Sequence, residues 1–250
     1  MTSAKTKVQR LVVFGDSTVD DGNAFRMTGG VQAAPPNWRG RYSNGPVVVE
    51  YLAKGLGATL DNYAVGGATT ADLVSQIDEF VRRGRPLGEG DVVLAWAGSN
   101  DLEGIDVANR RLLRERISAA AANLAAVIER LRRLGATRFV IVTRTPHGRL
   151  VGDNDLGNAE LDALVDATGE RPGPDIVTYD AYESVRDMAA NPGRHGLTNT
   201  KNECIQVPAC ISESYDTGLG VANGFVHWDG AHYTTRAHQI MGEQLLRMLR

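Results

Sequence analysis

The sequence of 250 residues lacks any apolar run that approaches the roughly 20 residues needed to cross a bilayer, which argues against a transmembrane helix. It also lacks a strong charge bias. Its 27 lysines and arginines stand against 30 aspartates and glutamates, so charge gives no reason to expect nucleic acid or an anionic membrane as a partner. No apolar signal-peptide region follows the basic first residues. We therefore expect a cytoplasmic protein, or a secreted or periplasmic one whose leader has been removed.

Cysteine is scarce as well, and only Cys204 and Cys210 occur, in a stretch without helix or strand periodicity. A local disulfide between them would indicate an oxidising compartment. Two free thiols are the alternative. A zinc site is less favoured, because neither a C-x-x-C motif nor a second pair of ligands is present. The cysteines alone leave the compartment open.

Predicted strands and helices alternate along the chain, which is typical of an α/β fold. Short apolar runs predict buried strands at Arg10–Gly15 and Asp91–Ala97. Three further strands are expected at Thr59–Val65, Thr137–Thr143 and Asp175–Tyr179. Helical periodicity predicts helices at Pro46–Leu56, Thr70–Arg83, a long stripe from Leu113 to Leu134 ended by Gly135, and Thr234–Arg250. We expect one domain over residues 1–250, a doubly wound five-stranded parallel sheet flanked by helices. Residues 22–45 and 191–228 read as long irregular segments, which in compact domains are often functional.

Residues suited to acyl transfer follow the first three predicted strands. Ser17 follows the first strand, the pair Gly66-Gly67 follows the second, and Asn100 follows the third. Ligands of open parallel sheets bind beyond the carboxyl ends of the strands. A nucleophile, a flexible glycine pair and a side-chain amide are therefore expected on one rim of the sheet.

A serine hydroxyl needs a base to become an effective nucleophile. The chain has five histidines, and His232 is the favoured base because Asp229 precedes it by three residues. In a tight turn this spacing lets the carboxylate accept the Nδ1–H of the imidazole, which leaves Nε2 to face the serine. No G-x-S-x-G motif occurs, so the common α/β-hydrolase fold is disfavoured.

Four segments, in order, resemble the sequence blocks of the GDSL, or SGNH, family of serine esterases and lipases, particularly its plant-lipase-like branch. They are FGDSTVDDGN at 14–23, NYAVGGAT at 62–69, GSND at 98–101 and WDGAH at 228–232. The stretch RYSNG at 41–45 is similar to the R-F-S-N-G of that branch. The resemblance covers most of the chain and implies the family's flavodoxin-like α/β fold.

The resemblance also implies a site and a reaction. Ser17 takes the position of the nucleophile, His232 that of the base and Asp229 that of its orienter. The backbone N–H groups of Ser17 and Gly67 and the amide of Asn100 take the positions of the oxyanion hole. No metal or cofactor is implied, the partner is a small-molecule ester, and the oligomeric state is not indicated.

A disulfide before the last block is common in the plant-lipase-like branch, which favours pairing of Cys204 with Cys210. Acyl transfer to an alcohol and carbohydrate O-deacetylation use the same residues and stay as alternatives. A non-catalytic binding protein has no need of the full set of residues.

Simpler interpretations of the same residues exist. Ser17 is a possible helix N-cap, Gly67 a turn glycine and Asn100 a loop amide. Asp229 and His232 are possible caps of the final helix or, with His227, ligands of a metal. Asp16 and His238 are expected to be structural, and Asp20 and Asn23 to shape the loop after the nucleophile. His147 and His195 carry no motif.

Three departures from the family pattern stand out. Thr18 replaces the leucine of the motif, Tyr233 replaces a usual proline, and Pro146–Pro174 is short for this region. The change at Thr18 bears on packing and the short region on the substrate class, and the predicted chemistry is unchanged.

Overall fold

A computed structural model describes residues 7–106, 108–143, 176–212 and 220–250. Within these ranges, five parallel strands form one sheet in the order β2-β1-β3-β4-β5. The strands are β1 (Arg10–Gly15), β2 (Thr59–Asn62), β3 (Asp91–Trp96), β4 (Phe139–Thr143) and β5 (Ile176–Asp180). This order is that of a doubly wound, flavodoxin-like sheet, and it confirms the predicted fold class.

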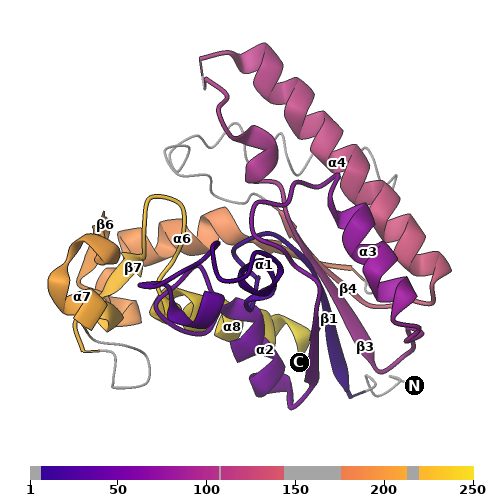
Figure 1. Ribbon diagram of the computed structural model, residues 1–250, viewed down its shortest axis with the longest axis horizontal. Coiled ribbons are helices and arrows are strands. Elements are labelled where there is room, and N and C mark those ends of the chain that lie inside the picture. The colour runs from indigo at the N-terminus through magenta and orange to yellow at the C-terminus, as the bar shows by residue number, and fades with distance from the viewer. Residues whose placement is uncertain (1–6, 107, 144–175, 213–219) are drawn as a thin grey trace.

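Helices cover both faces of the sheet (Figure 1). One face carries α2 (Val48–Leu56), α6 (Ala181–Ala190) and α8 (Thr235–Leu249), and α2 and α8 pack directly against each other. The other face carries α3 (Leu73–Arg82) and α4 (Arg110–Arg133). None of the described helices has the length and hydropathy needed to span a bilayer.

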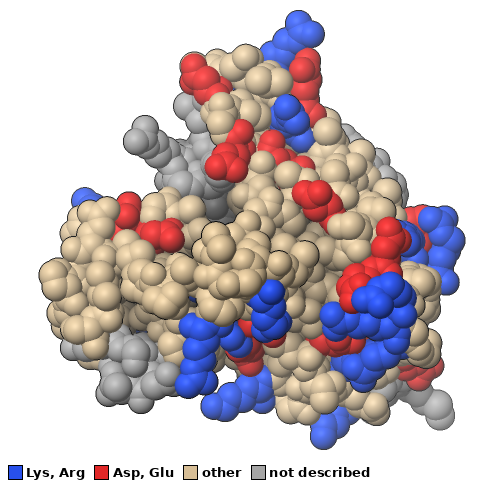
Figure 2. All heavy atoms as spheres, in the orientation of Figure 1, with Lys and Arg blue, Asp and Glu red and all other residues tan. Residues whose placement is uncertain are grey.

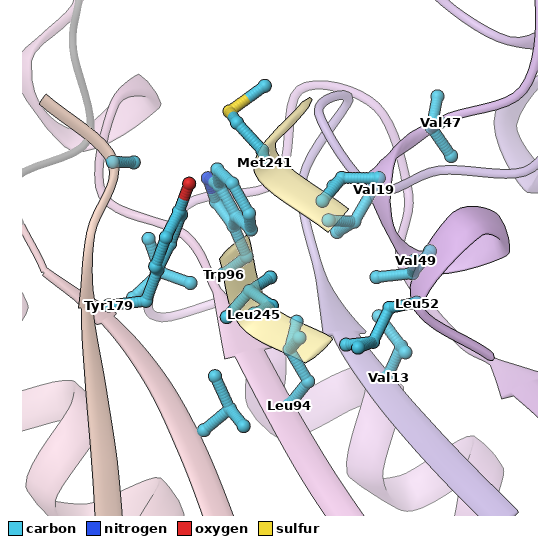
Figure 3. Packing of buried hydrophobic residues seen from close by; sticks show 14 of the residues in the cluster. Val13, Val19, Val47, Val49, Leu52, Leu94, Trp96, Tyr179, Met241 and Leu245 are labelled. Atoms are coloured by element: carbon cyan, nitrogen blue, oxygen red, sulfur yellow. The ribbon is translucent and has the colours of Figure 1, made fainter. Parts of the chain in front are cut away.

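The two faces of the sheet hold separate hydrophobic clusters, because successive strand residues point to opposite faces. In the first cluster, Trp96 packs near Tyr179, and Met241 and Leu245 reach down from α8 onto the strands (Figure 3). In the second, the Phe14 ring lies stacked on Tyr63 at 5.6 Å. β1, the strand that leads into the Ser17 turn, is buried on both faces, so both clusters hold it in place.

The predicted elements agree with the structure except at their ends. The second strand was expected to reach Val65, but β2 ends at Asn62. Backbone hydrogen bonds to β1 nevertheless continue, because the N–H groups of Tyr63 and Val65 donate to the carbonyls of Val13 and Gly15. The Asn62 side chain adds a bond to the carbonyl of Val19 and accepts the N–H of Ala64. Gly135 has φ 100° just after α4, as expected of a glycine that ends a helix.

Residues 191–228 are more regular than the sequence indicated, and the expectation of an irregular segment was wrong. They contain a second, two-stranded parallel sheet of β6 (Asn199–Glu203) and β7 (Phe225–His227), which lies at the far end of the molecule from α4 (Figure 1). β6 is polar throughout and β7 has only three residues, so neither strand carries an apolar alternation to find. The region Pro146–Pro174 lies outside the described residues.

Short helical turns complete the described chain. They are α1 (Asn23–Met27), η1 (Trp38–Gly40), η2 (Asn100–Leu102), η4 (Pro192–His195), η5 (Cys204–Gln206), α7 (Pro208–Ser212) and η7 (Ala222–Gly224).

Candidate active site

The turns after β1, β2 and β3 meet at the carboxyl edge of the sheet, because the three strands are parallel neighbours. Gly15, the last residue of β1, lies against the backbone carbonyl of Trp96, and a Cβ atom there would overlap that carbonyl. Gln76 of α3 holds the same glycine by accepting its N–H and donating to its carbonyl, each at 2.8 Å. The turn that carries Ser17 is thus held on two sides.

Ser17, His232 and Asp229 form a continuous hydrogen-bonded chain. The Nε2 atom of His232 lies 2.9 Å from the Ser17 Oγ, and its Nδ1 lies 2.9 Å from both carboxylate oxygens of Asp229. The backbone N–H groups of Ala231 and His232 donate to the Asp229 Oδ1 at 2.8 Å. The D-x-x-H spacing therefore brings carboxylate and imidazole together in one turn, in the order that general-base activation of a serine requires.

Asp229 is held in its charged form. Burial acts to raise its pKa, but the hydrogen bond and charge of His232 and the backbone N–H groups of Ala231 and His232 outweigh burial and lower the pKa below its ordinary value. A carboxylate at this position can fix the imidazole tautomer and stabilise an imidazolium.

Ser17 and His232 line a cavity of about 290 Å³, and the expected oxyanion residues Gly67 and Asn100 border it too. Gly67 has φ 84°, a left-handed conformation that favours glycine, and it is exposed to the cavity. The Asn100 Nδ2 donates to the carbonyl of Ala68 at 2.8 Å. An amide nitrogen has two hydrogens, so this bond fixes the side chain and leaves one hydrogen for another acceptor.

Two buried aspartates support the turn of the nucleophile. Asp16 is fully buried, accepts the Thr18 N–H and the Ser99 hydroxyl, and has a pKa raised by burial. Asp20 is also fully buried and accepts the backbone N–H of Gly66 at 2.9 Å. It accepts further N–H groups from the loop after it, those of Gly22, Asn23 and Ala24. Both aspartates thus occupy the structural positions that the sequence indicated.

The segment at 41–45 braces the loop that carries the histidine. The Ser43 hydroxyl donates to the carbonyl of Tyr233, and the Asn44 Oδ1 accepts the N–H of Thr235. The Tyr42 ring stacks on His232, with ring centroids 4.9 Å apart and planes at 29°. Sequence reasoning missed Tyr42 as a residue of the site; its position in the RYSNG stretch was the available signal.

The remaining histidines lie apart from this chain of hydrogen bonds. His195 contacts Asp187 at 2.8 Å, and His238 is buried on α8. His227 lies beside the Tyr233 ring, and burial lowers its pKa. His147 lies outside the described residues. Among the described residues, no group of histidine, cysteine and acidic side chains is arranged to hold a metal ion.

Cys204 and Cys210 are joined in a disulfide and are fully buried. They pack with Phe225 and Trp228, and the N–H of Ile205 donates to the Trp228 carbonyl. The Trp228 N–H in turn donates to the carbonyl of His232 at 2.9 Å. Two backbone hydrogen bonds through Trp228 thus connect the segment next to the disulfide with His232.

The face of the molecule drawn in Figure 2 carries charged side chains of both signs. In Figure 2, lysine and arginine side chains gather toward the lower half of the face shown, with aspartate and glutamate among them. On α3, Glu79 forms ion pairs with Arg82 and Arg83.

The chain matches the family model described as GDSL-like Lipase/Acylhydrolase over residues 11–245. It is 24% identical over 273 residues to a thermolabile hemolysin of Vibrio parahaemolyticus, covering 96% of this chain and 63% of that protein's length. It is also 24% identical over 320 residues to a GDSL esterase/lipase of Arabidopsis thaliana, covering 96% of this chain and 90% of that protein.

Among solved structures, a member of the lipolytic protein G-D-S-L family from Veillonella parvula superposes with a TM-score of 0.57. It has 13% sequence identity and covers 96% of this chain and 97% of that chain. At this identity the likeness concerns the fold. The family match spans nearly the whole chain and contains all four sequence blocks, and the protein therefore belongs to the GDSL-like lipase/acylhydrolase family.

Proposed function

We propose that this protein hydrolyses carboxylic esters through an acyl-enzyme on Ser17. The observation that carries the proposal is the chain of hydrogen bonds from Ser17 through His232 to Asp229, which opens into a cavity bordered by Gly67 and Asn100. Membership of the lipase/acylhydrolase family supports the reaction class.

The first half of the reaction forms the acyl-enzyme. The Ser17 Oγ attacks the ester carbonyl carbon while the His232 Nε2 takes the serine proton. The carbonyl oxygen becomes an oxyanion, which accepts hydrogen bonds from the backbone N–H groups of Ser17 and Gly67 and from the amide of Asn100. The C–O bond to the alcohol then breaks, and the imidazolium returns its proton to the leaving alcohol.

The second half repeats these steps with water. His232 takes a proton from a water molecule, the resulting hydroxide attacks the acyl carbon, and Ser17 leaves with the proton held by His232. The products are a carboxylic acid and the free enzyme. Each donor of the oxyanion hole contributes most when charge has developed on oxygen, and losing one typically lowers kcat by about 10²–10³.

The cavity favours a short acyl group. Its volume of about 290 Å³ is at the lower end of small-molecule sites, which run from roughly 300 to 1,000 Å³. Its described lining includes the polar side chains of Thr18, Gln32, Ser99 and Glu103. A long alkyl chain would leave these polar groups without hydrogen bonds.

A chain-length series of p-nitrophenyl esters tests the proposal. We expect the acetyl and butyryl esters to be hydrolysed faster than the octanoyl and decanoyl esters, with all turnover lost in Ser17→Ala. Ser75→Ala, which changes an exposed serine of α3, is the matched control and should keep wild-type rates. Turnover by Ser17→Ala contradicts the mechanism.

An added alcohol acceptor separates hydrolysis from acyl transfer. With glycerol present, a hydrolase continues to release free acid as its main product, whereas a transferase forms a new ester in its place. An acetylated oligosaccharide in the same assay tests O-deacetylation.

A further inference from the structure

The two residues that flank Asn100 each hold a different neighbouring turn of the rim. On one side, the Ser99 hydroxyl donates to the buried Asp16 carboxylate beside the nucleophile, at 3.1 Å. On the other side, Asp101 reaches the loop that carries Gly67. Asn100 therefore lies between two contacts that join the β3 turn to the β1 turn and to the β2 loop.

Asp101 makes two hydrogen bonds to a single buried residue. Its Oδ2 accepts the backbone N–H of Thr70 at 2.9 Å, and its Oδ1 accepts the Thr70 hydroxyl at 2.6 Å. Thr70 is fully buried, and its hydroxyl also accepts a hydrogen bond from the Asn123 Nδ2 of α4 at 3.0 Å. The β3 turn, the β2 loop and α4 are thus connected through one hydroxyl group.

The same two loops carry two of the three expected oxyanion donors. Gly67 lies three residues before Thr70, and Asn100 immediately precedes Asp101. The Asn100 amide uses one hydrogen to contact Ala68 of the β2 loop, so the direction of its second hydrogen depends on where that loop lies. Anything that sets the spacing of the two loops sets the geometry of both donors.

We propose that Asp101 is a positioning residue: its paired hydrogen bonds to Thr70 hold the Gly67 loop and Asn100 at the separation that the oxyanion requires. The inference rests on the proposed function. Hydrogen bonds to an ionised carboxylate are shorter and stronger than neutral ones, and donors aimed in advance need no rearrangement during the reaction. Acyl transfer is sensitive to displacements of about 1 Å, which can cost about a hundredfold in rate.

Asp72 provides a matched control. Its carboxylate accepts the backbone N–H of Thr69 at 2.8 Å and the Thr69 hydroxyl at 2.7 Å, the same pair of bonds made to the neighbouring threonine. These bonds close a local turn of four residues, Thr69 to Asp72, and do not connect two loops. Asp101→Ala and Asp72→Ala therefore remove the same chemistry, but only the first separates the β2 loop from the β3 turn.

The experiment compares kcat and KM of these variants on p-nitrophenyl acetate, with thermal unfolding measured for each. We expect Asp101→Ala to lower kcat by about a hundredfold with KM changed by less than about threefold, and Asp72→Ala to keep kcat within about twofold. Asp101→Asn should recover most of the lost kcat, because an amide can accept the Thr70 N–H while the threonine hydroxyl turns to accept from the amide. Equal rates for Asp101→Ala and wild type, or equal losses in both alanine variants, overturn the proposal.

A double variant tests the link to Asn100. Because Asp101 is proposed to position both Gly67 and Asn100, Asn100→Ala/Asp101→Ala should be slower than Asn100→Ala but should lose less kcat than the product of the two single losses. Losses that multiply would mean that Asp101 acts elsewhere. If Asp101→Asn is as slow as Asp101→Ala, the negative charge matters more than position, and the proposal is again wrong. Ser17→Ala is assayed in parallel: an active Ser17→Ala refutes the proposed function, whereas an inactive one with a fully active Asp101→Ala refutes only the positioning role.

Discussion

His238 is expected to make the fold sensitive to mild acid. This side chain is 1% exposed on α8, its ring meets Tyr233 edge-on at 6.0 Å, and its Nδ1 has no hydrogen-bond partner among the described residues. Burial, with a smaller effect from the charge of His232, lowers the pKa of His238 from 6.5 to about 3. At pH values between about 3 and 6.5, His238 binds a proton in the unfolded chain but not in the folded protein, so the free energy of unfolding falls as the pH falls.

The size of this effect follows from the difference in protonation. Each pH unit below 6.5 contributes about 1.4 kcal/mol, so lowering the pH to 5 should cost about 2 kcal/mol through this one residue. His238→Phe keeps an aromatic ring beside Tyr233 and removes the titrating group. Urea unfolding at pH 7.5 and pH 5 should show wild type losing about 2 kcal/mol more than the variant. The comparison between pH values cancels the packing cost of the substitution. Equal losses in both proteins would refute the reasoning.

The site and its supports give three further predictions. Asn100→Ala should lower kcat by about 10²–10³ with a smaller change in KM, and an effect confined to KM would make the amide a ground-state contact. Freshly purified, unreduced protein should contain no titratable thiol under denaturing conditions, and Cys204→Ser/Cys210→Ser should lower stability by about 2 kcal/mol or less, with a loss of activity, in chemical unfolding and ester assays. Gly66→Ala should lower kcat, because its Cβ would overlap the Tyr42 ring that stacks on the histidine; an unchanged kcat in steady-state assays would show that the ring moves freely.

The sheet was accessible from sequence because buried parallel strands leave continuous apolar runs, as in β1 and β3. The roles of the polar residues that connect these elements could not be predicted from the sequence. Nothing in the periodicity indicates that the Asn62 side chain bonds to the carbonyl of Val19, or that β6 and β7 pair, since β6 is polar and β7 has only three residues.

In the candidate site, too, some contacts could be predicted from the sequence and others could not. Residues brought together by short spacing, such as Asp229 and His232, or by the common rim of parallel strands, such as Ser17 and Asn100, could be expected to meet. Tyr42 and His232 are nearly 200 residues apart in the sequence, and their stacking depends on how the fold brings their two loops together. Local sequence patterns do not encode this. The paired bonds of Asp101 to Thr70 join two loops and were likewise invisible before the fold was known.

Covalent labelling of the nucleophile tests the central claim most directly. A fluorophosphonate reacts with a serine that is activated by a neighbouring base, and here the Ser17 Oγ lies 2.9 Å from the His232 Nε2. Intact mass and peptide mapping of the treated wild-type protein should show one adduct, on Ser17, and no adduct in folded His232→Ala. Labelling of another serine, or undiminished labelling of Ser17 in His232→Ala, would contradict the assignment of Ser17 and His232 as nucleophile and base.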